Sequence, residues 1–177
     1  MRRLLLLALA IVCAGAALPV ARDEIESRGS GDLIDGRIVE AVDGDTVKVL
    51  GSGGRRYSVR LIGIDTPETR RPGVGIECGG PQASAHMKTL APPGTRVRLR
   101  TDPTQDTYDR YERLLAYVTT RDGTSLQARM LAAGWATTYV YDDKPFQRVE
   151  RFREAERRAR AAGRGVHGLC GGDFHLR

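Results

Sequence analysis

Apolar and polar residues alternate along five short stretches of the chain, which is the pattern of strands with one buried face. Asp43-Gly44-Asp45 separates the first two stretches, and Gly51-Ser52-Gly53-Gly54 separates the second from the third. Both are turn sequences that favour antiparallel hairpins. The pattern therefore predicts a three-stranded meander followed by two more strands. The five predicted strands are residues 37–42, 46–50, 56–64, 96–101 and 114–120.

Three further stretches space their apolar residues at helical intervals. The first begins at Pro81 and ends before the Pro92-Pro93 pair, and the second can be capped by Thr124 or Ser125. The third, residues 146–162, has a narrow apolar stripe on an otherwise charged helix. These elements predict an α+β fold that is mainly β, a five-stranded oligonucleotide-binding (OB) barrel with three helices.

The first residues have the charged start and short apolar centre of a secretory signal peptide. Arg2 and Arg3 precede an apolar run that is too short to span a bilayer comfortably. Cleavage after Ala16 fits the preference for small residues, and Ala17 and Ala21 are alternatives. We therefore expect an exported protein, secreted or retained in the cell envelope, with no transmembrane span in the mature chain.

The rest of the chain divides by composition into one folded domain and two flanks. A lipid anchor at Cys13 is a minor alternative to ordinary signal-peptide cleavage; it is minor because a lipid anchor requires a small residue before the cysteine, and Val12 stands there. The predicted segments are a signal peptide (1–16), a flexible lead-in (17–35), the folded domain (36–170) and a C-terminal tail (171–177).

The chain is basic, which suits a polyanionic partner such as DNA or RNA. Its formal net charge is +6 and falls by two when Arg2 and Arg3 leave with the signal peptide. Residues 96–101 alternate arginines with apolar residues and so predict a strand with a positive face. We expect the protein to be a monomer. Cys78 and Cys170 remain after export, and a disulfide between them is the simplest interpretation.

Candidate chemistry gathers where the third predicted strand ends. Arg60 interrupts an apolar run, and Asp65, Thr66 and Glu68 follow in the next turn. With Asp45 from the first hairpin, the aspartates are hard oxygen ligands suited to Ca²⁺, whereas the scattered histidines make zinc a poor fit. Glu68 can accept a proton from water, and the planar fork of Arg60 can hold a phosphate. Two structural alternatives remain: residues 65–68 can be simply a polar turn, and Arg60 can form a core salt bridge with one of the aspartates.

A second arginine and two tyrosines extend this set. Arg113 opens the fifth predicted strand and can meet Arg60 across the site. Tyr111 and Tyr139 offer flat faces on which a base or sugar can stack, although a single tyrosine more often belongs to the core or its rim.

Three motifs in this order resemble the staphylococcal nuclease (thermonuclease) family, over about residues 36–170. The motifs are Asp43-Gly44-Asp45-Thr46, Arg60 with Asp65-Thr66-Pro67-Glu68-Thr69, and Tyr111-Glu112-Arg113-Leu114-Leu115-Ala116-Tyr117. The resemblance implies the same barrel with three helices and Ca²⁺-dependent cleavage of DNA and RNA to 3′-phosphate products. Three motifs in one order are more specific than any one of them.

The resemblance also implies a role for each matching residue. The calcium ligands are matched by Asp45, Asp65 and the Thr66 carbonyl. The carboxylate that activates water is matched by Glu68, and the pair that grips the phosphate by Arg60 and Arg113. The nucleotide contacts are matched by Arg110, Tyr111 and Tyr139. Two positions depart from the family pattern: Glu112 replaces a glycine, and His167 replaces an aromatic residue.

The alternative function is a non-catalytic OB module that binds nucleic acid. A binder would not need Glu68 together with both arginines, so this combination favours an enzyme. One structural condition follows from strand geometry. Strict alternation would place Asp65 on the face opposite Arg60, so the site requires a break in strand pairing near Gly63.

Overall fold

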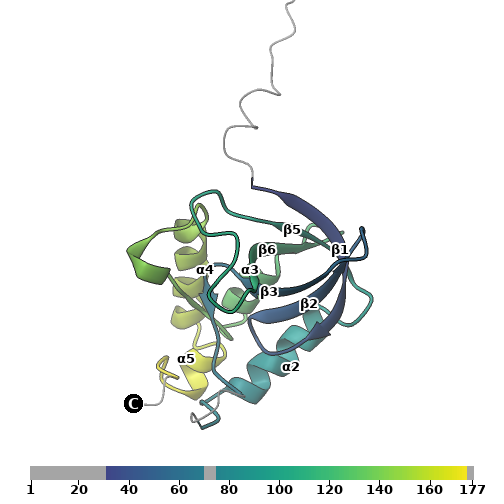
Figure 1. Ribbon diagram of the computed structural model, residues 1–177. Helices are drawn as coiled ribbons and strands as arrows, with labels where there is room; N and C mark the ends of the chain where they lie inside the picture. The colour runs from purple at the N-terminus through teal and green to yellow at the C-terminus, as the bar shows by residue number, and fades with distance from the viewer. Residues whose placement is uncertain (1–30, 70–74, 175–177) are drawn as a thin grey trace, which may run out of the picture.

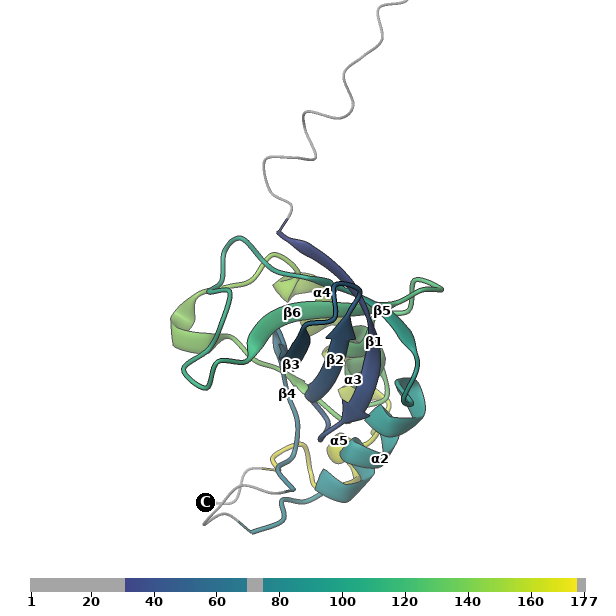
Figure 2. The ribbon, with the colours of Figure 1, turned by 45° about the vertical axis from the view of Figure 1, so that its right-hand side comes forward.

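The computed structural model describes residues 31–69 and 75–174, in which five strands close into a barrel (Figures 1 and 2). Around the barrel the strands follow the order β1-β2-β3-β6-β5, in which β3 and β6 run parallel and all other neighbours run antiparallel. The predicted five-stranded OB barrel in an α+β, mainly β fold is confirmed. The barrel strands are β1 (Leu33–Ala41), β2 (Thr46–Gly51), β3 (Arg56–Leu61), β5 (Arg96–Arg100) and β6 (Leu114–Thr120).

The alternating pattern places one face of each strand inside the barrel. In β2, Val47 and Val49 are fully buried while Lys48 and Leu50 face outward. The pairing of β1 with β2 changes register between Ile38 and Glu40. Such an irregularity bends a strand and helps a small sheet to close on itself.

The helices lie along the side and the lower end of the barrel (Figure 1). The three predicted helices are present as α2 (Gly80–Leu90), α3 (Leu126–Ala132) and α4 (Val149–Ala161). The short helix α5 (Val166–Leu169) and the 3-10 turn η1 (Tyr141–Asp143) were not predicted, because elements of three or four residues are too short to show a periodicity.

The structure defines the first residues of two helices, α3 and α4. The side chain of Ser125 accepts a hydrogen bond from Ala128 N at 3.3 Å, so Ser125 and not Thr124 caps α3. The last long helix begins at Val149 and not at residue 146, which corrects the prediction. Phe146 instead packs into the core, where it is 3% exposed.

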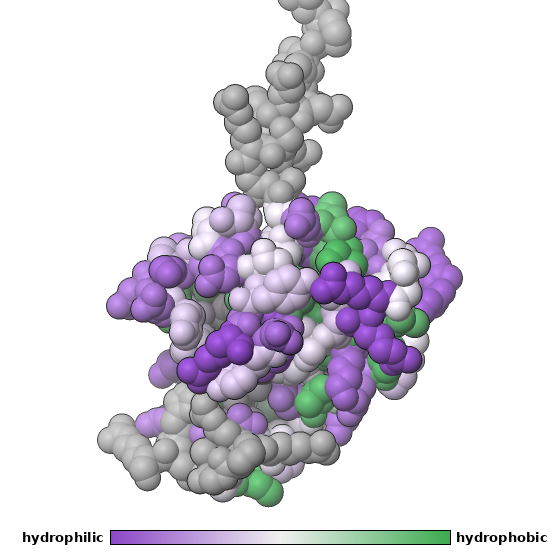
Figure 3. All heavy atoms as spheres, viewed as in Figure 1, coloured by the Kyte–Doolittle hydropathy of each residue, from purple (hydrophilic) through white to green (hydrophobic). Residues whose placement is uncertain are grey.

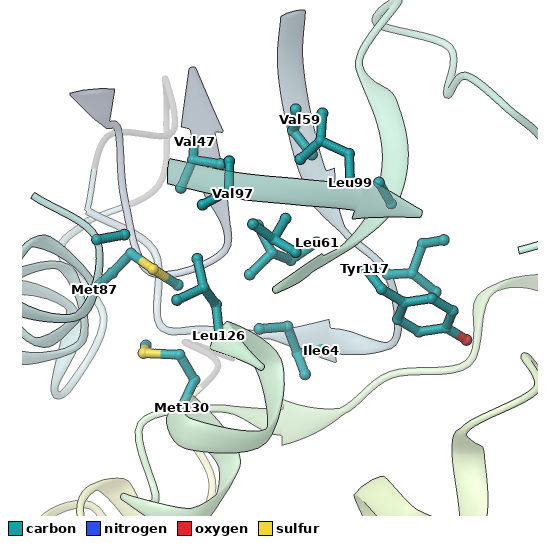
Figure 4. Packing of buried hydrophobic residues seen from close by; sticks show 14 of the residues in the cluster. Val47, Val59, Leu61, Ile64, Met87, Val97, Leu99, Tyr117, Leu126 and Met130 are labelled. Atoms are coloured by element: carbon teal, nitrogen blue, oxygen red, sulfur yellow. The ribbon is translucent and has the colours of Figure 1, made fainter. Parts of the chain in front are cut away.

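The core fills the barrel and continues beneath it, where two helices cover the open end (Figure 4). Met87 of α2 and Met130 of α3 are fully buried, as is Leu126. These side chains lie close to the barrel residues Leu61 and Val97. Burial of each such apolar side chain contributes about 1.5–3 kcal/mol, so the helices are part of the domain's stability.

The folded region extends beyond both predicted boundaries. β1 begins at Leu33, inside the stretch 17–35 that was predicted to be a flexible lead-in. Phe174 is 2% exposed, so part of the predicted tail 171–177 packs on the domain. The predicted signal peptide (1–16), with Cys13, lies outside the described residues.

The predicted disulfide is present. Cys78 and Cys170 are bonded; their Cα atoms are 6.0 Å apart, and the two residues are 92 positions apart in sequence. The bond joins the segment before α2 to the residue after α5. Across residues 31–69 and 75–174, helices are too short or too polar to cross a membrane.

Candidate active site

The turn between β1 and β2 presents two aspartates at one end of the barrel. Asp43 Oδ1 accepts hydrogen bonds from Asp45 N at 3.0 Å and Thr46 N at 2.8 Å, which fixes the turn. A side chain at Gly44 would come within 2.6 Å of Thr66 Oγ1, so the turn lies directly on the segment that follows β4 (Ile64–Asp65). Only glycine allows this approach.

Asp45 connects this turn to the predicted Asp65-Thr66 pair. Thr66 donates to Asp45 Oδ2 from its backbone N at 3.3 Å and its hydroxyl at 3.1 Å. Asp45 and Thr66 are both buried. Burial, followed by the negative charge of Asp45, raises the pKa of Asp43 to about 6, although hydrogen bonds and Arg60 oppose this rise. The Asp43 carboxyl is therefore less acidic than that of an exposed aspartate.

Arg60 lies between the two aspartates predicted to bind calcium. Its Nη1 is 3.1 Å from Asp45 Oδ2, and its Nη2 is 3.1 Å from Asp65 Oδ1. Nη1 also donates to Ile64 O at 2.8 Å. The guanidinium is largely shielded from solvent and is fixed in orientation by these contacts. The salt bridge that the sequence offered as an alternative is therefore present, and it brings Arg60, Asp45 and Asp65 to one place.

Arg113 reaches the same cluster from the position just before the barrel strand β6. Its Nε and Nη2 each lie 2.7 Å from Asp109 Oδ2, and its Nη1 lies 3.4 Å from Thr46 Oγ1. The Thr46 hydroxyl in turn donates to Asp45 Oδ1 at 3.0 Å. Both predicted phosphate-binding arginines are thus linked to Asp45, Arg60 directly and Arg113 through Thr46.

Glu68 lies beyond this cluster on a partly buried segment. Its backbone N donates to Glu77 Oε2 at 2.7 Å, and its own Oε1 accepts from Thr69 N at 3.2 Å. The residue is partly exposed.

The predicted nucleotide-contacting residues occupy two exposed positions. Tyr111 is 61% exposed; the Arg110 guanidinium lies 4.8 Å from its ring centroid and that of Arg113 lies 5.4 Å away. Tyr139 is 45% exposed, and its backbone N donates to Gly63 O at 3.0 Å. Tyr111 is therefore attached to the arginine side of the cluster and Tyr139 to the turn before Asp65.

Comparison with known proteins decides the family. Residues 58–167 match the family model described as "Staphylococcal nuclease homologue". The chain belongs to the staphylococcal nuclease family. This match covers most of β3, all of β5 and β6, and helices α2 to α4. It includes Arg60, Asp65 and Arg113 and begins after Asp45.

Three relatives illustrate the likeness to this family. Endonuclease YncB of Bacillus subtilis (strain 168) is 36% identical over 136 residues, which are 76% of this chain and 62% of that protein. The SPbeta prophage-derived endonuclease YokF of the same organism is 38% identical over 131 residues, 73% of this chain and 43% of that protein. A thermonuclease of Staphylococcus hyicus is 34% identical over 82 residues, 46% of each chain. The chain thus spans less than two thirds of the length of YncB and of YokF.

Three residues beside the predicted site residues were not singled out from the sequence: Asp43, Asp109 and Tyr141. Asp109 orients Arg113, and hydrogen bonds from Arg113 and Tyr111 keep its pKa below the usual range although burial opposes them. Its position four residues before Arg113 is a sequence signal that could have indicated this ion pair. Asp43 was interpreted only as a turn residue. Tyr141, 63% exposed with its ring centroid 6.5 Å from that of Tyr139, carried no sequence signal of its own.

Proposed function

We propose that this chain is a calcium-dependent nuclease that hydrolyses phosphodiester bonds in DNA and/or RNA to 3′-phosphate products. The observation that carries the proposal is the position of Arg60 between Asp45 and Asp65, with Arg113 joined to Asp45 through Thr46. Two carboxylates that can bind a cation and two guanidinium groups that can bind a phosphate meet at one end of the barrel. Family membership and the relatives named endonuclease and thermonuclease support a nuclease.

The residues present fit a calcium ion. Asp45 and Asp65 are close enough to share one guanidinium, and burial, followed by the negative charge of Asp45, raises the pKa of Asp43 beside them. Ca²⁺ accepts carboxylate, carbonyl and water oxygens in loose geometry. Across the described ranges 31–69 and 75–174 no group of three or more His, Cys, Asp or Glu is arranged to hold a metal, so water and the Thr66 carbonyl would complete the shell. When bound, the ion supplies positive charge beside the phosphate.

The two arginines stabilise the phosphate as its negative charge increases. A guanidinium presents parallel N–H donors that match two phosphate oxygens. Arg60 and Arg113 are held by carboxylates before substrate arrives, which orients their forks. Preorganised donors of this kind are among the largest contributions to catalysis.

Glu68 accepts a proton from the attacking water. Its carboxylate is on the partly exposed segment that follows Asp65 and Thr66, and its backbone is held by Glu77. A positioned carboxylate can act as general base in this way. Arg110, Tyr111 and Tyr139 bind the nucleotide by stacking and by charge. The face of the molecule in Figure 3 is mainly hydrophilic, with apolar side chains in small separate areas, which suits a charged substrate.

We further propose that the protein is exported. The charged and apolar pattern of residues 1–16 supports this, and so does the disulfide between Cys78 and Cys170, because such bonds persist mainly in oxidising compartments.

Cleavage of plasmid DNA and of RNA by the purified protein tests the proposal. We expect cleavage with Ca²⁺, none with a chelator, and 3′-phosphate ends on the products. Glu68→Gln should lose most of the turnover and still bind a nucleotide, whereas Glu150→Gln, an exposed position on α4, should keep the parental rate. Retention of nucleic acid without cleavage by the folded protein would identify a binding module instead. Cleavage by Glu68→Gln at the parental rate would exclude Glu68 as the base.

A further inference from the structure

Glu77 holds both backbone polar groups of Glu68. Its Oε2 accepts from Glu68 N at 2.7 Å, and its own backbone N donates to Glu68 O at 3.0 Å. Glu77 is 6% exposed, which is uncommon for a carboxylate. A Cβ at Gly80 would lie 2.8 Å from Glu68 O, so the chain at residue 80 also packs against Glu68. The backbone of Glu68 is therefore fixed by the segment Glu77–Gly80.

This segment is attached covalently to the C-terminal part of the domain. Cys78, next to Glu77, is bonded to Cys170 at the end of α5. The neighbouring Gly79 has a φ of +84°, and a Cβ there would lie 3.0 Å from Val166 Cγ1. The segment thus combines a disulfide with a close backbone contact to α5.

The other end of the disulfide lies on a firmly packed helix. Val166 is fully buried, and its backbone N donates to Gly134 O at 2.8 Å. Cys170 N donates to Val166 O, also at 2.8 Å. Gly134 follows α3, whose Leu126 and Met130 belong to the core. The disulfide therefore connects Glu77 to the core through α5.

We propose that Glu77 is a positioning residue for Glu68, and that the Cys78–Cys170 disulfide holds Glu77 in place, so that turnover depends on the disulfide. This rests on the proposed role of Glu68. A general base displaced by about 1 Å can lose about a hundredfold in rate. Without the disulfide, Glu77 can move with the chain on either side of it, and its contact with Glu68 N competes with hydration of the carboxylate. A chain in which both cysteines are thiols is then a poor nuclease even with Ca²⁺ present.

Kinetics of Glu77 variants at saturating Ca²⁺ test the first part. Glu77→Ala should lower kcat about tenfold or more with little change in KM, because Glu68 is misplaced while substrate contacts remain. Glu77→Gln should recover part of the loss, since its amide oxygen can still accept from Glu68 N. Glu150→Ala is the matched control and should keep the parental kcat. A parental kcat for folded Glu77→Ala would overturn the proposal.

Removal of the disulfide tests the second part. Cys78→Ser and the double variant Cys78→Ser/Cys170→Ser should lower kcat more than KM when assayed well below the melting temperature of each variant. Reduction of the parental protein by a phosphine, which converts the disulfide to two thiols, should have the same effect. A parental kcat for all three forms while folded would show that the disulfide only stabilises the domain.

A readout independent of activity separates this proposal from the proposed function. Hydrogen exchange of the Glu68 amide, followed by NMR, should be slow in the parental protein and faster in Glu77→Ala and in Cys78→Ser. If the parental protein cleaves nothing, the proposed function fails, and the exchange rates still test the positioning. Unchanged exchange at Glu68 in both variants would overturn it.

Discussion

Arg60 and Asp65 form an ion pair, with Nη2 and Oδ1 3.1 Å apart, although an unbroken strand would point them to opposite faces. The chain turns between them. β3 ends at Leu61, Gly63 has a φ of +79°, and β4 then pairs with β7 (Thr137–Thr138) in a separate two-stranded sheet. The break that the sequence required near Gly63 is confirmed, and regular barrel pairing does not continue through Asp65.

Gly63→Ala should therefore be strongly destabilising. The positive φ disfavours any L side chain, and the new Cβ would lie 2.4 Å from Phe146 Cζ. We expect a loss of about 2–4 kcal/mol in the free energy of unfolding, measured by urea denaturation. Gly53→Ala is the control, because a Cβ there meets nothing within 4 Å. Equal stability of the two variants would contradict the role of Gly63.

Arg113→Ala should impair turnover far more than Arg110→Ala. Arg113 contacts Asp109 and, through Thr46, the Asp45 cluster, whereas the described contacts of Arg110 are with Tyr111. We expect kcat/KM to fall about a hundredfold or more for Arg113→Ala and less than tenfold for Arg110→Ala. Calcium-dependent cleavage of a labelled oligonucleotide measures both. Equal losses would contradict the assignment of Arg113 to the phosphate.

The barrel could be predicted from the sequence because each of its strands carries its own alternation. Val47 and Val49, or Val97 and Leu99, reveal a strand without knowledge of its partner. The pairing of β4 with β7 could not be predicted, since two residues show no alternation and their partner is more than 70 positions away.

The candidate site was predictable to the extent that its residues form local motifs. Asp45, Arg60 and Asp65 were selected from their residue types, but their convergence depends on the turn at Gly63 and on the contact of Gly44 with Thr66. Contacts between residues that are separated in sequence, such as the hydrogen bond of the Glu77 side chain to the Glu68 backbone, depend on packing and could not be predicted.

Glu112→Gly should stabilise the domain. Glu112 has a φ of +59°, which explains why a glycine suits this position and gives the departure from the family pattern a conformational cost. We expect a gain of about 1 kcal/mol in the free energy of unfolding. Glu112→Ala removes the charge but keeps a Cβ, so it should gain much less. Equal gains for the two variants would show that charge and not backbone strain is responsible.

Asp102→Asn should destabilise the domain and make its free energy of unfolding depend less on pH in the acid range. Asp102 is 2% exposed and accepts hydrogen bonds from Tyr117, Thr104 and Gln147. Burial opposes ionisation, but these hydrogen bonds outweigh it and lower the pKa. The carboxylate therefore stabilises the fold above its unfolded pKa of about 4, and this contribution is lost as the pH falls through the lower folded value.

The expected cost of Asp102→Asn near neutral pH is about 2–3 kcal/mol, because an amide NH₂ would face donors. Urea denaturation between pH 2.5 and 7 should show a shallower acid dependence for the variant. A loss of stability that is the same at every pH would mean that ionisation of Asp102 contributes nothing.

His167→Phe should stabilise the domain, most clearly at acidic pH. Among residues 31–69 and 75–174, neither ring nitrogen of His167 finds a hydrogen-bond partner, and both are shielded from solvent. Burial and then the Arg160 charge lower its pKa, while Glu156 opposes them. The unfolded chain therefore binds a proton more readily than the folded one, so stability falls as the pH drops below the unfolded pKa of about 6.5. We expect gains of about 1–3 kcal/mol at pH 5.5 and smaller gains at pH 8. Urea denaturation at both pH values compares His167→Phe with its parent in an His86→Gln background, which removes a second histidine with a lowered pKa. Asp43, with a pKa of about 6, titrates in both proteins and cancels in the comparison. A stability difference between pH 5.5 and pH 8 that persists unchanged in His167→Phe would show that another group titrates.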